Sequence, residues 1–495
     1  MEKILPLGIV NFRGKEIKFG IKPEDRLRHI YIIGKTGGGK TTLLENMINF
    51  DIQQGSGFAF LDPHGDSVQR ILNLIPKERI DDVIYFNPTD VNHPMGFNPL
   101  EKVAWEHRHL TALSLLSVFK KIWVDAWSAR MEYILTNTLL ALLEWPNSSL
   151  LDVNRLLSDD KFRKMVVSNL KDEVVKAFWE QEFSKYHLQF RTEAIAPIQN
   201  KIGQFITNPL IRNIIGQTES AFDLRKVMDE GKIFLANLSV GAIGEETSRL
   251  LGGLLVVKFQ LSAMSRVDIP ENERRDFYLY IDEFQNFANE SFINILSEAR
   301  KYRLSLTLAN QYLDQVPEEI SKAIFGNVGT FIVFRLGAKD AEIFSKEFNY
   351  LVNVDDFVNL PSYYVYVKLL VDGKPTDPFL ALTLPPPKTE VSFKDEIIAL
   401  NHLKYAKRRS LVEGRIARIF KEVKEEGKEL ILCRECRQPF LSSGEEICDD
   451  CLSKVKSGIS FKKAMEREII VEKKKEEKII NKNIDEILKK LTNEY

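Results

Sequence analysis

Gly34-Lys35-Thr36-Gly37-Gly38-Gly39-Lys40-Thr41 matches the pattern G-x-x-x-x-G-K-[ST] of phosphate-binding loops at every defined position. The β-branched and aromatic run Ile30-Tyr31-Ile32-Ile33 precedes it, and apolar residues recur at helical spacing from Leu43 to Ile48 after it. A strand, a glycine-rich loop and a helix in this order direct backbone N–H groups and the positive helix end at one point, which suits phosphate oxygens. The stretch therefore predicts a nucleotide site within an α/β fold.

The chemistry of such loops predicts roles for individual residues. Lys40 is expected to reach the β- and γ-phosphates of ATP, and the Thr41 hydroxyl is expected to bind Mg2+. The residues predicted to contact the nucleotide or its magnesium ion are Gly34, Lys35, Thr36, Gly37, Gly38, Gly39, Lys40, Thr41, Thr42 and Asp282.

An acidic pair ends the apolar run Phe277-Tyr278-Leu279-Tyr280-Ile281. Phosphoryl transfer needs a carboxylate near the metal ion and a group that positions the attacking water. Asp282 is predicted to hold Mg2+, directly or through a water, and Glu283 is predicted to orient or deprotonate the water. The alternative is an acidic strand end that meets solvent.

Two further apolar runs, Gly57 to Asp62 and Ser305 to Asn310, end in polar residues. In open α/β sheets ligands bind beyond the carboxyl ends of the strands, so Asp62 and Gln311 are expected to face the nucleotide. Gln311 is predicted to sense the γ-phosphate by hydrogen bonding, and the alternative for it is a purely structural amide.

Four additional motifs follow the same order along the chain: Leu61-Asp62-Pro63-His64-Gly65-Asp66, Gly96-Phe97-Asn98-Pro99-Leu100, Asp282-Glu283-Phe284-Gln285-Asn286-Phe287 and Asn310-Gln311-Tyr312-Leu313-Asp314-Gln315. Together with the phosphate loop they resemble the motifs of TraG/TraD-like coupling ATPases, which serve conjugation and type IV secretion within the FtsK/HerA superfamily. The resemblance covers about residues 25 to 385.

This resemblance implies a RecA-like domain that hydrolyses ATP, assembles as a hexamer with ATP at subunit boundaries, and moves DNA through a central channel. It also implies an arginine supplied by a neighbouring subunit, for which Arg28 is the first candidate and Arg300 the second. Such an arginine would stabilise charge on the transferring phosphoryl group. The alternative for either residue is a solvated charge or an intrachain ion pair. Relaxase or secretion-channel proteins are the further partners that the family suggests.

The sequence departs from many coupling proteins because it lacks membrane-spanning helices. Its longest apolar candidate, Leu250 to Val257, runs directly into Lys258 and is far shorter than a span of about 20 residues. We therefore expect a cytoplasmic protein. The alternative is a peripheral position at the inner face of the membrane. Three other functions stay open: an ATP-driven adaptor for protein cargo, a HerA-like cytosolic DNA-processing ATPase, and a zinc-dependent DNA-binding factor whose phosphate loop is only a switch.

Composition narrows the class of protein only slightly. Hydrophobic residues make up 44 % and charged residues 28 %, which excludes a largely disordered chain. The formal net charge of −1 neither favours nor excludes nucleic acid, because a local basic surface can be offset elsewhere.

Hydrophobic periodicity changes along the chain and suggests five parts. Strand signals stop after Asn98-Pro99, and apolar residues at helical spacing begin at Met131, which indicates a helical insertion. The run Pro385-Pro386-Pro387 ends the sheet domain, because consecutive prolines continue neither ladder nor helix. The predicted parts are 1–100 with 231–387 (RecA-like ATPase domain), 101–230 (all-helical insertion), 388–430 (basic helical linker), 431–455 (zinc ribbon-like module) and 456–495 (charged helical tail).

All four cysteines lie in two C-x-x-C pairs near the C-terminus. Four thiolates at this spacing can close a tetrahedron around Zn2+, which predicts a structural zinc site formed by Cys433, Cys436, Cys448 and Cys451. The alternatives are a redox pair or disulfides, although a reducing cytoplasm disfavours disulfides.

Overall fold

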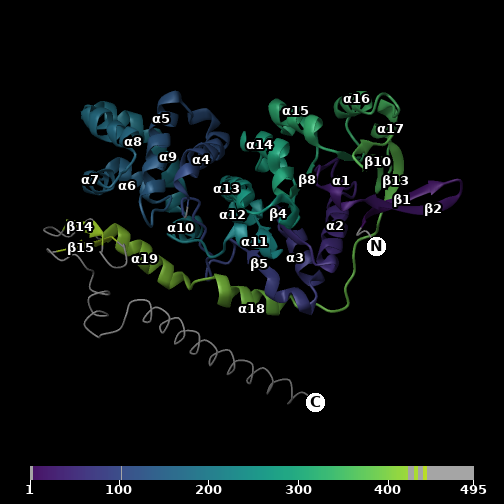
Figure 1. Ribbon diagram of the computed structural model, residues 1–495, viewed down its shortest axis with the longest axis horizontal. Helices are drawn as coiled ribbons and strands as arrows, with labels where there is room; N and C mark the ends of the chain where they lie inside the picture. Colours follow the sequence, from purple (N-terminus) through teal and green to yellow (C-terminus); the bar gives the residue numbers. More distant parts are fainter. Residues whose placement is uncertain (1–3, 102, 422–428, 433–438, 443–495) are drawn as a thin grey trace, which may run out of the picture. The chain divides into compact units, whose positions relative to one another are not determined.

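The computed structural model describes residues 4–101, 103–421, 429–432 and 439–442 (Figure 1). The chain divides after Ile416 into two compact units. Within the second unit, β14 (Glu429–Leu432) and β15 (Pro439–Ser442) pair as an antiparallel hairpin. All four cysteines and the segment 456–495 lie outside the described residues, so the zinc module and the helical tail remain predictions.

The first unit is built on one mixed sheet of eleven strands, which confirms the predicted α/β fold. The strand order is β2-β1-β13-β10-β9-β3-β8-β7-β4-β6-β5. The strands are β1 (Leu5–Phe12), β2 (Lys15–Ile21), β3 (Ile30–Ile33), β4 (Gly57–Asp62), β5 (Val83–Phe86), β6 (Ile233–Asn237), β7 (Phe277–Ile281), β8 (Leu304–Asn310), β9 (Thr330–Val333), β10 (Tyr364–Lys368) and β13 (Phe379–Thr383). A separate short hairpin joins β11 (Leu370–Val371) and β12 (Lys374–Pro375).

Seven neighbouring strands, from β9 to β5, run parallel. Every residue of these strands is buried, as expected where helices cover both faces of a parallel sheet. Their carboxyl ends therefore share one edge. Strand β8 lies between β3 and β7, so the phosphate loop and the acidic pair are two strand spacings apart, about 10 Å.

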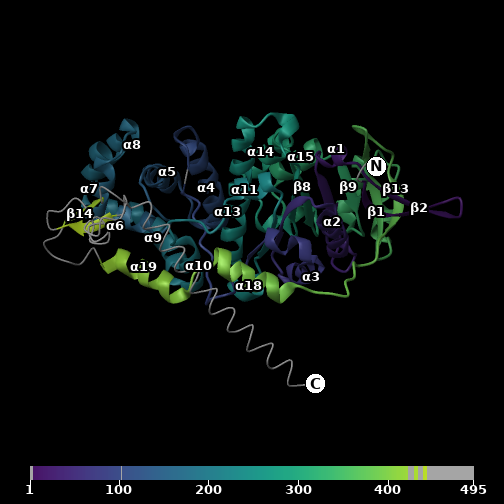
Figure 2. The same ribbon diagram turned by 60° about the horizontal axis from the view of Figure 1, so that its bottom comes forward.

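The four strands at the other end of the sheet pair antiparallel with their neighbours. Strands β1 and β2 form a hairpin whose two turn residues, Arg13 and Gly14, have φ of 53° and 77°. Positive φ at both positions matches the type I′ turn, whose twist suits two-residue hairpins. This hairpin lies at the opposite side of the first unit from the helical insertion (Figures 1 and 2).

Helices cover both faces of the parallel strands. On one face α2 (Lys40–Gln54), α3 (Asp66–Leu74) and α18 (Lys394–Tyr405) contribute to a single hydrophobic core. On the other face α13 (Glu245–Met264) packs Phe259 on Phe234, and α16 (Ala338–Glu347) stacks Phe344 on Tyr31. The remaining elements around the sheet are α1 (Pro23–Arg26), η1 (Lys77–Asp82), α12 (Val240–Ile243), η6 (Ser265–Asp268), η7 (Glu271–Glu273), η8 (Phe284–Asn286), α14 (Ser291–Glu298), η9 (Ala299–Tyr302), η10 (Leu313–Gln315), α15 (Glu318–Asn327) and α17 (Val354–Val358).

One helix among the described residues, Glu245–Asp268, is long and apolar enough to cross a membrane by length and composition. Its most apolar window has a mean hydropathy of 1.3, and 67 % of that window is buried inside the protein. Core helices of globular proteins have the same properties, and here the helix covers the sheet.

Between β5 and β6 the described residues form helices and no strand. These helices gather beside the sheet in both views (Figures 1 and 2). Their centre is aromatic: Trp123 is buried and stacks on Phe119 with the ring centroids 4.7 Å apart. They are η2 (Trp105–His107), α4 (Arg108–Ile122), η3 (Val124–Ala126), α5 (Ala129–Glu144), α6 (Asp152–Ser158), α7 (Asp160–Ser168), α8 (Glu173–Ala177), η4 (Phe178–Glu182), η5 (Phe183–Lys185), α9 (Leu188–Thr207), α10 (Pro209–Ile215) and α11 (Leu224–Glu230).

Residues 388–416 return across the first unit, and we call this segment the C-terminal strap. It holds α18 and the first part of α19 (Arg409–Lys421). The side chain of Asn401 in α18 accepts from the Tyr85 N–H and donates to the Val83 oxygen, so it pairs with the outermost strand β5. Further along, Val412 and Ile416 pack on Leu151 of the insertion. The strap therefore contacts both the sheet and the inserted helices.

Candidate nucleotide site

The backbone of the phosphate loop is held by its neighbours on the sheet. The Gly34 N–H donates to the Asn310 oxygen at 3.3 Å, and the Lys35 N–H donates to the Arg335 oxygen at 2.9 Å. On the far side of the loop, the Gly38 oxygen accepts from the Tyr363 N–H at 2.8 Å. Strand ends β8, β9 and β10 thus brace the loop that follows β3.

Two glycines of the loop occupy positions where a side chain would clash with a neighbour or strain the backbone. A Cβ atom on Gly34 would lie 2.4 Å from Cβ of Phe334, which is closer than real carbon atoms approach. Gly39 has φ of 117° and forms the N-cap of α2, a backbone conformation that favours glycine. No side chain caps α2, so its first N–H groups point at the loop, and Thr41 and Thr42 lie in its first turn.

Lys40 is buried at the centre of the loop, where its Nζ donates to the Gly34 oxygen at 2.6 Å. Burial lowers the pKa of Lys40, while the negative charges of Glu283 and Asp282 act in the opposite direction. The lysine therefore lies within electrostatic reach of the acidic pair. The fold thus brings together two motifs that are 242 positions apart in the sequence, counted from Lys40 to Asp282.

Asp282 is buried where β7 ends, and its N–H donates to the Leu61 oxygen of β4 at 3.2 Å. Burial, together with the nearby charges of Glu283 and Asp62, raises the pKa of Asp282 to about 7, although Lys40 opposes this shift. Two carboxylates act on the one lysine, and the charge of Asp62 acts on Asp282, so the site has an excess of negative charge that a divalent cation would neutralise. Carboxylate and hydroxyl oxygens are suitable ligands for Mg2+, so Asp282 and Thr41 fit the predicted metal site.

Glu283 has φ of 44° and ψ of 50°, a left-handed conformation that is uncommon for a glutamate and typical of strained functional positions. Its two carboxylate oxygens are each held by an amide. Oε1 accepts from Nε2 of Gln311 at 3.0 Å, and Oε2 accepts from Nε2 of Gln285 at 2.9 Å. Gln285 was not predicted as a site residue, although its position two residues after Glu283 within the motif was a usable signal.

Asp62 accepts hydrogen bonds from the backbone that follows β4. Its Oδ1 accepts from the His64 N–H at 2.9 Å, and its Oδ2 accepts from the N–H groups of Ser67 and Val68 at 3.0 and 3.1 Å. The carboxylate therefore holds the turn into α3, and it acts on the site through its charge on Asp282.

The two arginine candidates lie together, away from the phosphate loop of their own chain. Arg28 precedes β3 and Arg300 precedes β8, so both are at the amino ends of strands whose carboxyl ends carry the site. They line one cavity of about 420 Å³ together with the acidic residues Glu24, Asp25 and Asp372. Strand β3, which is about 13 Å long, separates Arg28 from the loop.

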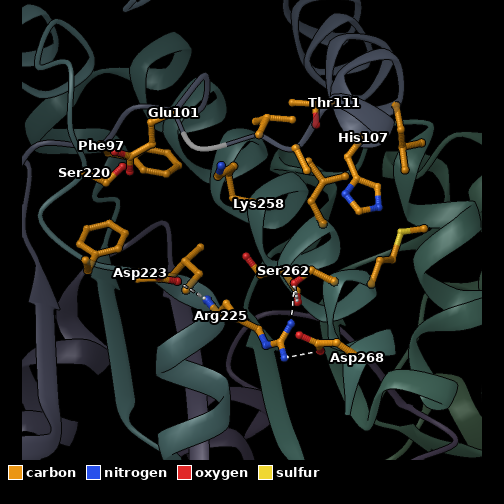
Figure 3. A pocket seen from close by; sticks show the side chains of 18 residues that line it. Phe97, Glu101, His107, Thr111, Ser220, Asp223, Arg225, Lys258, Ser262 and Asp268 are labelled. Carbon is orange, nitrogen blue, oxygen red and sulfur yellow. Dashed lines mark hydrogen bonds and ion pairs between the residues drawn. The ribbon is translucent and has the colours of Figure 1, made fainter. Parts of the chain in front are cut away.

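Another cavity, of about 360 Å³, lies where the chain enters and leaves the helical insertion (Figure 3). Residues around Phe97 and Ser220 line it together with the end of α13. One of the cations that line it, Arg225, is paired, since its Nη2 donates to Oδ1 of Asp268 at 2.7 Å. None of the described residues that line this cavity is a glycine, so they do not form the glycine-rich loop by which the predicted nucleotide site would hold phosphates.

Comparison with known proteins agrees with this geometry. Residues 17–349 match the family described as type IV secretion-system coupling protein DNA-binding domain. A search among curated proteins finds no match.

Solved structures share the fold at low sequence identity. The bacterial conjugative coupling protein TrwBdeltaN70, in its unbound monoclinic form, has a TM-score of 0.54 and 15 % identity, and the match covers 77 % of this chain and 89 % of that one. The plasmid coupling protein TrwB in complex with ADP and Mg2+ has a TM-score of 0.54 and 16 % identity, over 74 % and 88 % of the two chains. VirB4 of Thermoanaerobacter pseudethanolicus has a TM-score of 0.51 and 15 % identity, over 77 % and 96 %.

The family match spans more than half of the sequence, and it includes the phosphate loop, the acidic pair and Gln311. The chain belongs to the type IV secretion-system coupling protein family, within the P-loop ATPases of the FtsK/HerA superfamily.

Proposed function

We propose that the protein is an ATP-hydrolysing, DNA-translocating motor that works as a hexamer in type IV secretion or conjugation. The observation that supports this most directly is the convergence of Lys40, Asp282, Glu283 and Gln311 at the carboxyl edge of one parallel sheet, about 10 Å across from β3 to β7. This is the arrangement that phosphoryl transfer from a bound triphosphate requires.

Each site residue has a role in binding or hydrolysing the nucleotide. The backbone N–H groups of residues 34–42 and the open end of α2 bind phosphate oxygens. Lys40 exchanges its present acceptor, the Gly34 oxygen, for the β- and γ-phosphates. Thr41 and Asp282 would hold a magnesium ion, which would offset charge on the phosphates. Glu283 orients and deprotonates the attacking water, and Gln311 links that carboxylate to strand β8.

The position of the arginines supports assembly. Arg28 and Arg300 are on the edge opposite the phosphate loop, so in a head-to-tail ring they would face the nucleotide of the next subunit. Such an interface completes the site only when subunits close, because a guanidinium then stabilises the developing phosphoryl charge. We propose Arg28 as the principal arginine, since it is attached directly to the strand that carries the loop.

The family description names DNA binding, which supports DNA as the substrate that the ring moves. We propose a cytoplasmic location, a relaxase or a secretion channel as protein partners, and a structural Zn2+ bound by the four cysteines. The adaptor and HerA-like functions differ from this proposal in cargo rather than in the chemistry of the site.

The decisive experiment measures ATPase rate with single-stranded DNA, double-stranded DNA and no DNA, together with the mass of the assembled species. We expect stimulation by DNA, a hexamer mass, and loss of turnover in Lys40→Ala. Lys15→Ala, an exposed lysine on the β1–β2 hairpin, is the matched control and should retain wild-type turnover. Equal rates with and without DNA, combined with capture of a relaxase-like protein, would favour the adaptor.

A further inference from the structure

A cluster of two histidines and one aspartate lies far from the phosphate loop. Asp90 and His93 are in the loop that follows β5, and His402 is in α18 of the C-terminal strap. The three side chains are half-buried, and each offers a ligand atom within 4.8 Å of the other two. Residues separated by 309 positions, from His93 to His402, thus meet at one point.

The polar contacts within the cluster converge on the aspartate. Oδ2 of Asp90 lies 2.7 Å from Nε2 of His402, and its Oδ1 lies 3.2 Å from Nδ1 of His93. The backbone N–H of His93 also donates to Oδ1 at 3.1 Å, which holds the carboxylate in place. The imidazole rings stack with their centroids 4.0 Å apart and an interplanar angle of 18°.

We propose that Asp90, His93 and His402 bind a divalent transition-metal ion of the Zn2+ type. Two imidazole nitrogens and a carboxylate are the ligands that Zn2+ takes from proteins when a water completes the tetrahedron. Ligand atoms around tetrahedral Zn2+ are about 3.3 Å apart, given bonds of about 2.0 Å, and the two contacts of Asp90 with the histidines, at 2.7 and 3.2 Å, are already that short. The stacked rings would have to turn for both nitrogens to direct their lone pairs at one ion. Partial exposure leaves a path for the ion and room for the water.

The site would fasten the strap to the sheet. Within the cluster, α18 is attached by the contact of His402 with Asp90. A bound ion would join His402 to both Asp90 and His93 through coordination bonds. Because the strap also packs on the insertion through Val412 and Ile416, the ion would stabilise the contact between the insertion and the edge strand β5. This inference does not depend on the proposed motor function.

The test is a calorimetric titration of the full-length chain with ZnCl2, followed by metal analysis of the dialysed protein. It compares the wild-type protein with the double variant His93→Gln/His402→Gln. His109→Gln, an exposed histidine of α4, is the matched control. Each protein is also prepared with all four cysteines replaced by serine, which separates this site from thiolate binding.

We expect the double variant to bind one equivalent fewer than the wild-type protein and the control in both backgrounds. Added Zn2+ should raise the melting temperature of the cysteine-free wild-type protein and leave that of the double variant unchanged. Asp90→Asn, which keeps the shape of the side chain, should weaken zinc binding by at least about tenfold. This single variant tests the site even if the double variant folds poorly. Equal stoichiometry in the wild-type protein and the double variant, or no bound zinc in the cysteine-free protein, would overturn the proposal.

Discussion

Nε2 of Gln311 donates to Oε1 of Glu283 at 3.0 Å, across the carboxyl ends of the neighbouring strands β8 and β7. The second oxygen of Glu283 is held by Gln285 at 2.9 Å. Both amides donate, so they orient the carboxylate and leave its remaining lone pairs available as acceptors. A water that donates to Glu283 would therefore be held at a defined place beside the phosphates.

Glu283→Gln is expected to lower kcat by roughly 10²- to 10⁴-fold, the usual contribution of a general base, while ADP binding stays close to that of the wild-type protein. Gln311→Ala should lower kcat less, because the carboxylate keeps Gln285 as a partner. Single-turnover hydrolysis and fluorescent-nucleotide titration measure the two effects separately. A Glu283→Gln protein that hydrolyses ATP at the wild-type rate would exclude Glu283 as the base.

Mixing two inactive variants tests whether Arg28 acts on a neighbouring subunit. In rings that contain both Arg28→Ala and Glu283→Gln subunits, some boundaries combine an intact Glu283 with an intact Arg28 from the next subunit. We expect mixed rings to regain part of the ATPase rate, whereas either variant alone stays inactive. The same mixture with Arg300→Ala identifies which arginine matters, and absence of recovery in both mixtures would contradict an arginine supplied in trans.

The sequence predicted the central strands well, because buried parallel strands are continuous apolar runs. Phosphate chemistry needs a narrow set of residues, which is why candidate site residues could be named from the sequence. The predicted strand Gly57 to Asp62 has the same bounds in the structure, and Ser305 to Asn310 differs by one residue. The order of strands was not predicted. Only the structure shows that β8 lies between β3 and β7, and this order explains why Gln311 contacts Glu283.

Features that depend on tertiary contacts were missed. Strands β1 and β2 lie at the sheet edge, where mixed polar and apolar residues give a weak pattern, and the Arg13-Gly14 turn was the stronger signal. The contacts of Asp62 with the turn into α3 were not predicted, because a carboxylate after a strand can cap the following turn as well as face a ligand. The pairing of His402 with Asp90 could not be inferred, since no local pattern connects positions so distant.

Asp282 makes nucleotide binding depend on pH. Its pKa of about 7 in the free protein means that magnesium binding must displace a proton below that pH. We therefore expect affinity for Mg2+–ADP to rise about tenfold per pH unit below 7 and to level off above it. Asp282→Asn, which has no proton to lose, reports the contribution of ADP ionisation alone. Identical pH slopes for the two proteins would show that Asp282 does not titrate in this range.

His29 makes the unfolding free energy of the protein depend on pH in the acid range. It is buried with φ of 64°, its Nδ1 accepts from the Leu306 N–H at 3.0 Å, and its Nε2 is 3.2 Å from the Leu296 oxygen. Burial lowers the pKa of His29 from 6.5 to about 4, although the Leu296 contact opposes the shift. The unfolded chain therefore binds more protons between these values, and the unfolding free energy falls as pH drops through this window.

We expect this group to account for a loss on the order of 3 kcal/mol between pH 6.5 and 4, with its full contribution present above pH 6.5. His29→Gln can make both hydrogen bonds without titrating, so its urea-unfolding free energy should depend less on pH over the same range. A variant with the wild-type pH dependence would assign the acid sensitivity to other groups.

A buried ion pair joins α1 to the phosphate-loop helix α2. Arg26 of α1 donates from Nη1 and Nη2 to the two carboxylate oxygens of Asp51 in α2, at 2.7 and 2.6 Å, and both side chains are at most 3 % exposed. Tyr280 of β7 donates to the same carboxylate at 2.6 Å, and the guanidinium lies over the ring of Tyr278, 3.4 Å from its centroid.

Asp51→Asn would leave the Arg26 cation buried without its counter-charge, which typically costs about 3–5 kcal/mol of unfolding free energy. The double variant Arg26→Met/Asp51→Leu removes both charges and should be less destabilised than Asp51→Asn, because no isolated charge then stays in the core. Urea denaturation of the three proteins at neutral pH measures the differences. If the double variant were less stable than Asp51→Asn, the cost of an isolated buried charge would not explain the loss. The ion pair itself would then be what stabilises the junction of α1, α2 and β7.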